Sequence, residues 1–98
     1  MAARITITPE ELRTASTNFA NKAGEIREIL EYLRSEVNRL ESTWDGAAQD
    51  QFFMTYEEMA KTMAQFPEVV DGISQQLSAV AQTLEETDQA LAASLKSY

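Results

Sequence analysis

The sequence predicts an all-α protein, an antiparallel helix-turn-helix hairpin that dimerises into an elongated four-helix bundle. Apolar residues recur every seven positions along two long stretches, a spacing typical of packed helices and not of strands. A Trp-Asp-Gly tripeptide separates these stretches near the middle of the 98 residues. The chain has only 3 glycines and 2 prolines, so few positions interrupt a helix.

The first helix is expected over about residues 9–43. Thr8 precedes Pro9, and Glu11 stands three residues after Thr8, so these residues predict a capping box with proline at the first helical position. Two heptad series follow, offset from each other by four positions. They are Leu12, Phe19, Ile26, Leu33 and Leu40, and Ser16, Ala23, Leu30, Val37 and Trp44.

A turn is expected at residues 44–46, because glycine reaches backbone conformations that other residues rarely adopt. The heptad pattern then resumes and predicts a second helix over about 47–87, with a flexible tail over about 88–98, so that residues 1–98 form a single domain. Pro67 is expected to bend this helix without ending it, since the pattern keeps its phase. The two series are Phe52, Met59, Phe66, Ile73 and Val80, and Tyr56, Met63, Val70, Leu77, Leu84 and Leu91.

Two helices of similar length that are joined by a short turn must lie antiparallel. A lone pair would leave apolar residues beside the seam in water, so two hairpins are expected to pair into a bundle. Small residues in the first helix favour close approach of a second chain. The predicted dimer interface consists of Ala20, Ala23, Gly24 and Ile29.

Composition excludes several classes of function. The net charge of -8 disfavours binding to nucleic acid or to an anionic membrane surface. Without cysteine or histidine, the chain offers no usual zinc site, and no catalytic residue, metal or cofactor is expected. No apolar run is long enough for a signal peptide or a membrane span, so stable membrane insertion is not expected.

The motif Trp44-Asp45-Gly46 has two interpretations. Taken alone, it is a large residue that closes a helical seam before a glycine turn. Placed between two heptad helices in an acidic chain of this length, it resembles the WXG family of early-secreted-antigen-like (Esx-type) proteins over essentially the whole chain. The resemblance implies a dimeric hairpin that is exported folded by type VII (ESX-like) secretion, without a cleavable signal peptide, and that is cytoplasmic before export.

A second match to this family lies near the C-terminus, where Leu84, Asp88, Leu91 and Leu95 fit the pattern of the Firmicutes-like branch. The resemblance implies a secretion signal that an FtsK/SpoIIIE-type ATPase recognises, completed by the turn motif of a partner chain. The mycobacterial signal has tyrosine where Leu84 stands, which favours a homodimer over pairing with a sibling WXG protein. On pattern alone, Leu84 and Leu91 are better explained as seam residues and Asp88 as a solvated side chain, and it is Leu95, off the predicted seam, that favours the signal.

The role of the protein after export is open in the sequence, with virulence and co-export of other substrates both compatible with the family. Two alternatives from other classes remain. The amphipathic helices are compatible with a membrane-active effector, although the acidic surface disfavours it. A cytoplasmic coiled-coil scaffold would share the heptads but would give no reason for an apolar Leu95 off the seam.

Overall fold

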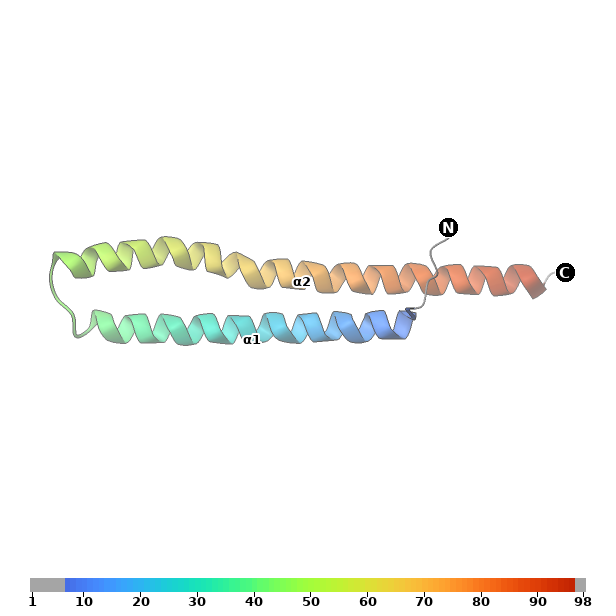
Figure 1. Cartoon of the computed structure of the whole chain (residues 1–98), viewed down its shortest axis with the longest axis horizontal. Helices are drawn as coiled ribbons and strands as arrows, with labels where there is room; N and C mark the ends of the chain where they lie inside the picture. Colours follow the sequence, from blue (N-terminus) through green and yellow to red (C-terminus); the bar gives the residue numbers. More distant parts are fainter. Residues whose placement is uncertain (1–6, 97–98) are drawn as a thin grey trace.

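The computed structural model of the chain describes residues 7–96, and it describes the side-chain environments of residues 7–89. It contains two helices, α1 (Pro9–Glu41) and α2 (Ala47–Lys96), which lie side by side and antiparallel (Figure 1). The molecule measures 80 × 24 × 18 Å, and its radius of gyration of 22.5 Å far exceeds the roughly 13 Å of a globular domain of this length. The predicted all-α hairpin is confirmed.

Helix α1 begins at Pro9 because hydrogen bonds between Thr8 and Glu11 satisfy backbone N–H groups at the start of the helix. The Thr8 hydroxyl accepts a hydrogen bond from the backbone N–H of Glu11 at 3.1 Å, and the Glu11 carboxylate accepts one from the backbone N–H of Thr8 at 3.0 Å. Pro9 has no N–H that would need a partner at this position. The capping box that the sequence predicts is therefore present.

Helix α1 ends at Glu41, slightly before the predicted end at about residue 43. The hydroxyls of Ser42 and Thr43 donate hydrogen bonds to the carbonyls of Arg39 and Leu40, at 2.7 and 3.2 Å. Side chains of this kind compete with helix propagation by satisfying the carbonyls of the last turn locally. The chain therefore leaves the helix before the tryptophan of the turn.

Helix α2 is longer than the sequence predicts. It begins at Ala47 and ends at Lys96, so it continues through residues 88–96, for which we predict a flexible tail. This segment is rich in alanine and leucine, which have high helix propensity. The helix also passes Pro67 without a break, and its axis bends towards α1 in this part of the chain (Figure 1). Residues 97–98 of the predicted tail lie outside the described part.

The contact between the helices uses one of the two predicted series of α2, the one that contains the buried Tyr56, but replaces the other. In α1 the predicted series that contains Ser16, Ala23 and Val37 faces α2, and Ala23 in it is 0% exposed. In α2, Ser74 and Ala81 are buried, whereas the predicted series from Phe52 to Val80 stays 36–60% exposed. Helix α2 is therefore rotated about its own axis relative to the predicted seam.

Side-chain size explains this rotation. Helix backbones approach more closely where the residues at the contact are small. Helix α1 presents Ser16 and Ala23 to this contact, and the stripe of α2 that replaces the predicted series is small or compact, beside the stripe of the buried Tyr56. Phenylalanine and methionine at the neighbouring heptad position would hold the helices apart, so they turn outward. The compact stripe of α2 consists of Ala60, Pro67, Ser74 and Ala81.

Candidate functional site: an apolar face, a turn and a tail

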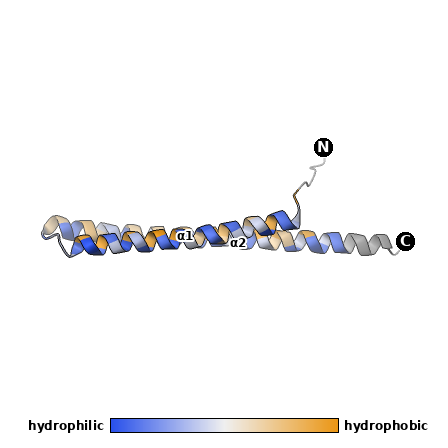
Figure 2. Cartoon of the chain, turned by 90° about the horizontal axis from the view of Figure 1, so that it is seen from below, coloured by the Kyte–Doolittle hydropathy of each residue, from blue (hydrophilic) through white to orange (hydrophobic). Residues whose placement is uncertain are grey.

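An apolar face runs along one side of the hairpin. Its members are large apolar side chains that the single chain leaves 36–60% exposed. Hydrophobic residues, coloured orange in Figure 2, recur along both helices over their paired length. The face is far longer than the scattered apolar residues of an ordinary protein surface. It consists of Phe19, Leu33 and Leu40 of α1, and of Phe52, Met59, Phe66, Ile73 and Val80 of α2.

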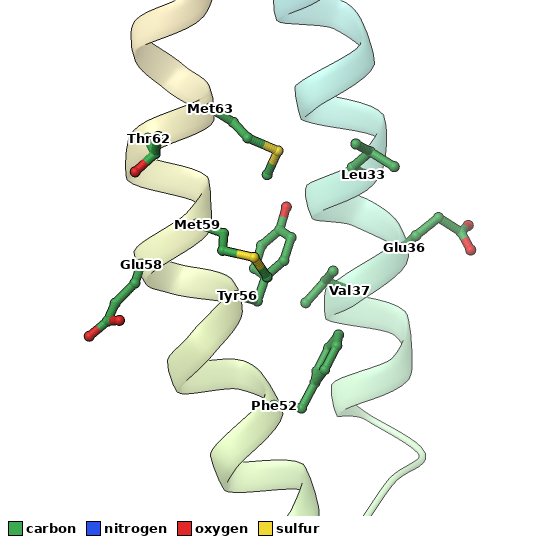
Figure 3. A pocket seen from close by; sticks show the side chains of 9 residues that line it. All are labelled: Leu33, Glu36, Val37, Phe52, Tyr56, Glu58, Met59, Thr62 and Met63. Carbon is green, nitrogen blue, oxygen red and sulfur yellow. The ribbon is translucent and has the colours of Figure 1, made fainter.

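The apolar face is hollowed near the turn. A groove of about 750 Å³ lies between the two helices. Glu36 and Glu58 border it, but their carboxylates point away from its centre (Figure 3). The interior of the groove is therefore apolar, and its shape suits an apolar side chain of another molecule. Its apolar lining consists of Leu33, Val37, Phe52, Tyr56, Met59 and Met63.

Ion pairs occupy the other flank of the contact between the helices, which we call the ion-pair flank. Three arginines of α1 share one heptad position, on the opposite side of the buried series from the apolar face. Each bonds a carboxylate of α2, and the distance from Arg27 Nη2 to Asp71 Oδ2 is 2.6 Å. The pairs are Arg13–Glu85, Arg27–Asp71 and Arg34–Glu57.

These bonds shift the pKa values of the partners. The hydrogen bond from Arg13 lowers the pKa of Glu85, and the hydrogen bond from Arg34 lowers the pKa of Glu57. Burial opposes both shifts but is the smaller effect. Water screens exposed pairs of this kind, so they contribute more to the alignment of the helices than to stability.

The turn closes the hairpin with an aromatic cluster. The ring centroid of Trp44 lies 5.5 Å from that of Phe52 and 5.9 Å from that of Phe53. Gly46 has a φ of +119°, which L-residues rarely adopt, and Asp45 beside it is exposed. Sequence reasoning places Trp44 at the turn but misses the two phenylalanines. Their position shortly after the turn is the signal that could have found them.

The predicted tail signal is described only in part. Leu84 is half-buried and Asp88 is exposed. Leu91 and Leu95 belong to α2, but their side chains lie outside the described part of the chain. The turn and the C-terminal end of α2 lie at opposite ends of the molecule (Figure 1). One chain therefore does not bring the turn motif and the tail strip together.

The four residues of the predicted dimer interface lie in different surroundings. Ala23 is 0% exposed, so it serves the contact inside the hairpin and is unavailable to a second chain. Ala20 is exposed at the heptad position of the ion-pair flank, and Gly24 is half-buried. Ile29 is 57% exposed beside the apolar face. Ile29 is therefore the one member of this set that is largely exposed next to the apolar face.

Over residues 7–89, no group of three or more carboxylates is placed to hold a metal ion. None of the helical stretches that the structure describes is long and apolar enough to cross a membrane. The surfaces that remain as candidates are suited to contact with another protein.

The hairpin, with its Trp-x-Gly turn and its exposed apolar face, defines the class of this protein. The chain belongs to the WXG100 family, described as proteins of 100 residues with WXG, and the match covers residues 4–89. This family consists of substrates of type VII secretion and includes secreted Esx proteins.

Individual relatives cover nearly the whole chain. Protein YukE of Bacillus subtilis is 33% identical over 92 residues, which cover 94% of this chain and 95% of that protein. The type VII secretion system extracellular protein A of Staphylococcus aureus is 29% identical over 89 residues, covering 91% and 92%. The crystal structure of the secreted protein EsxB from Bacillus anthracis matches with a TM-score of 0.76 and 37% identity, covering 89% of this chain and 99% of that one.

Proposed function

We propose that this chain is exported by a type VII secretion system as a folded dimer of two hairpins. The observation that carries the proposal is the apolar face, because a secreted protein that met water as a single hairpin would expose it along its length. A second copy of the chain covers this face in the proposed dimer. A sibling WXG protein is the alternative partner.

The exposed surface area of the single chain supports a second hairpin as the partner. The single chain exposes 7739 Å², whereas a globular monomer of 11.0 kDa exposes roughly 5,600 Å². Among residues 7–89, no large side chain is completely buried, and even Leu12 is 6% exposed. An isolated hairpin therefore has only a thin core, and a second hairpin supplies the other layer of a four-helix bundle.

An antiparallel arrangement of the two hairpins suits the export signal. The turn and the end of α2 lie apart in one chain, but in such a dimer the turn of one hairpin approaches the tail of its partner. In our proposal the FtsK/SpoIIIE-type ATPase reads both parts as one surface. That surface consists of Trp44 and Gly46 from one chain and Leu84, Asp88, Leu91 and Leu95 from the other.

The first test is the mass of the purified chain, measured by light scattering. We expect the mass of two chains for the parent protein and of one chain for Met59→Glu, which places a charge in the apolar face. Met54→Glu is the matched control, because Met54 is 66% exposed but lies outside this face. A parent chain that is a stable, helical monomer contradicts the proposed dimer.

The second test is export from cells that contain the secretion system. Deletion of residues 84–98 and Trp44→Ala should each abolish appearance of the protein in the medium while dimers persist inside the cell. Continued secretion of both variants contradicts the proposed signal. Dye release from anionic liposomes by detergent-free protein would instead support the membrane-active alternative. A role in virulence or in co-export is assigned by comparing cells with and without the gene.

A further inference from the structure

We propose that Ser16 and Ser74 determine which face of the hairpin is offered to a second chain. The Ser16 hydroxyl donates a hydrogen bond to the carbonyl of Ser74 at 2.7 Å, and the Ser74 hydroxyl donates one to the carbonyl of Ser16 at 2.7 Å. The two hydroxyl oxygens are 3.0 Å apart. We call this reciprocal contact the serine clasp. The inference rests on the proposed dimer, because it concerns how the dimer face is exposed.

The serine clasp lies in a contact that is otherwise apolar. Ser74 is 8% exposed and is the one buried polar side chain among residues 7–89, while Ser16 is half-buried. A buried hydrogen bond adds little net stability, but an arrangement that breaks it and covers Ser16 with apolar side chains leaves the Ser16 hydroxyl without a partner. A single buried polar contact in a helical seam therefore selects one packing arrangement among several.

The heptad pattern is compatible with a second packing arrangement of α2 against α1. If α2 rotated so that its series from Phe52 to Val80 faced α1, the helices would form the regular seam that the heptads predict. Ser74 would then turn away from Ser16, and both hydrogen bonds of the clasp would be lost. The bulky apolar side chains of this series would then be buried inside the hairpin. No apolar face would remain exposed for a second chain to cover.

The ion pairs do not prevent this rotation as effectively as the clasp does. Arginine and glutamate have long side chains that follow a rotating helix, and the Arg27–Glu68 distance of 3.7 Å already shows a loose partner. A serine hydroxyl is attached directly to Cβ and has no such reach. The clasp is therefore the contact that is most sensitive to the orientation of α2.

Spin labels test the orientation of α2 inside one chain. Cysteine replaces Glu28 and Gln75, which are both exposed, and the labelled protein is mixed with excess unlabelled chain so that intramolecular distances dominate. The parent should give one narrow distance distribution. S16A/S74A should add a second population displaced by on the order of 5 Å, the movement of a side chain on a helix surface that turns by part of a heptad. S35A/S78A, which changes two exposed serines, should match the parent.

The dimer dissociation constant is measured on the same variants without labels. For S16A/S74A we expect an increase of about tenfold or more with helical content retained, because alanine is a strong helix former. A single unchanged distance in S16A/S74A overturns the inference, and so does a changed distance with unchanged dimer affinity. A monomeric parent overturns the proposed dimer instead, and the spin-label distances still show whether the clasp orients α2.

Discussion

Replacing Phe66 by alanine should weaken the dimer without disturbing the hairpin. Phe66 belongs to the apolar face and is 60% exposed in the single chain. A phenylalanine has roughly 200 Å² of surface, so roughly 120 Å² of Phe66 is exposed in the single chain. Complete burial of this area at about 25 cal/mol per Å² contributes about 3 kcal/mol. If a second copy covers half of this area, each chain loses about 1.5 kcal/mol on truncation. The symmetric dimer loses about 3 kcal/mol, a roughly 150-fold rise in dissociation constant.

Sedimentation equilibrium over a range of concentrations measures this constant, and far-ultraviolet circular dichroism reports whether the helices persist. Met54→Ala removes a side chain that is 66% exposed but lies outside the apolar face, so its dissociation constant should equal that of the parent. The reasoning is refuted if Phe66→Ala dimerises within about threefold of the parent, because a change below roughly 0.7 kcal/mol is incompatible with a covered phenylalanine.

Three further predictions concern the hairpin itself. Thr8→Ala removes the capping box and should lower the free energy of unfolding in urea by about 1 kcal/mol. Gly46→Ala forces a side chain onto a φ of +119° and should cost roughly 1–3 kcal/mol, whereas Gly72→Ala, inside α2 with free space around it, should stabilise by about 0.5–1 kcal/mol; equal effects would contradict the strained turn. Arginine partners hold the pKa of Glu57 and Glu85 below the ordinary value of 4.5, so their stabilisation is present above that value and is lost as the pH falls through the lowered pKa. Acid titration of E57Q/E85Q should therefore show a smaller loss of stability below about pH 4 than the parent shows.

The sequence contains enough to predict the hairpin, because heptad spacing, the capping box and a central glycine each act locally. It does not contain an unambiguous orientation of α2. Apolar residues from Phe52 to Val80 indicate that this series is buried, but not whether its partner is α1 or another molecule. Small residues such as Ser74 and Ala81 are also spaced by seven, and packing distance decides between the two stripes. That decision depends on both helices together.

The candidate site was predictable to a similar degree. The position of Trp44 follows from its place between two heptad helices, but its aromatic partners depend on how the turn folds back. Ala23 illustrates the limit, because a small residue permits close approach equally well inside a hairpin and between chains. In this molecule Ala23 is completely buried in the contact inside the hairpin.

The ion-pair flank has a consequence for how the hairpin opens. Arg34 and Glu57, near the turn, are separated by 23 residues in the chain, whereas Arg13 and Glu85, near the open end, are separated by 72. Closing a longer loop costs more conformational entropy. The pairing of α1 with α2 therefore forms from the turn outwards and is lost first at the other end. The end of the contact where Arg13 pairs with Glu85 is therefore the first part to open, while the aromatic cluster at the turn holds the other end together.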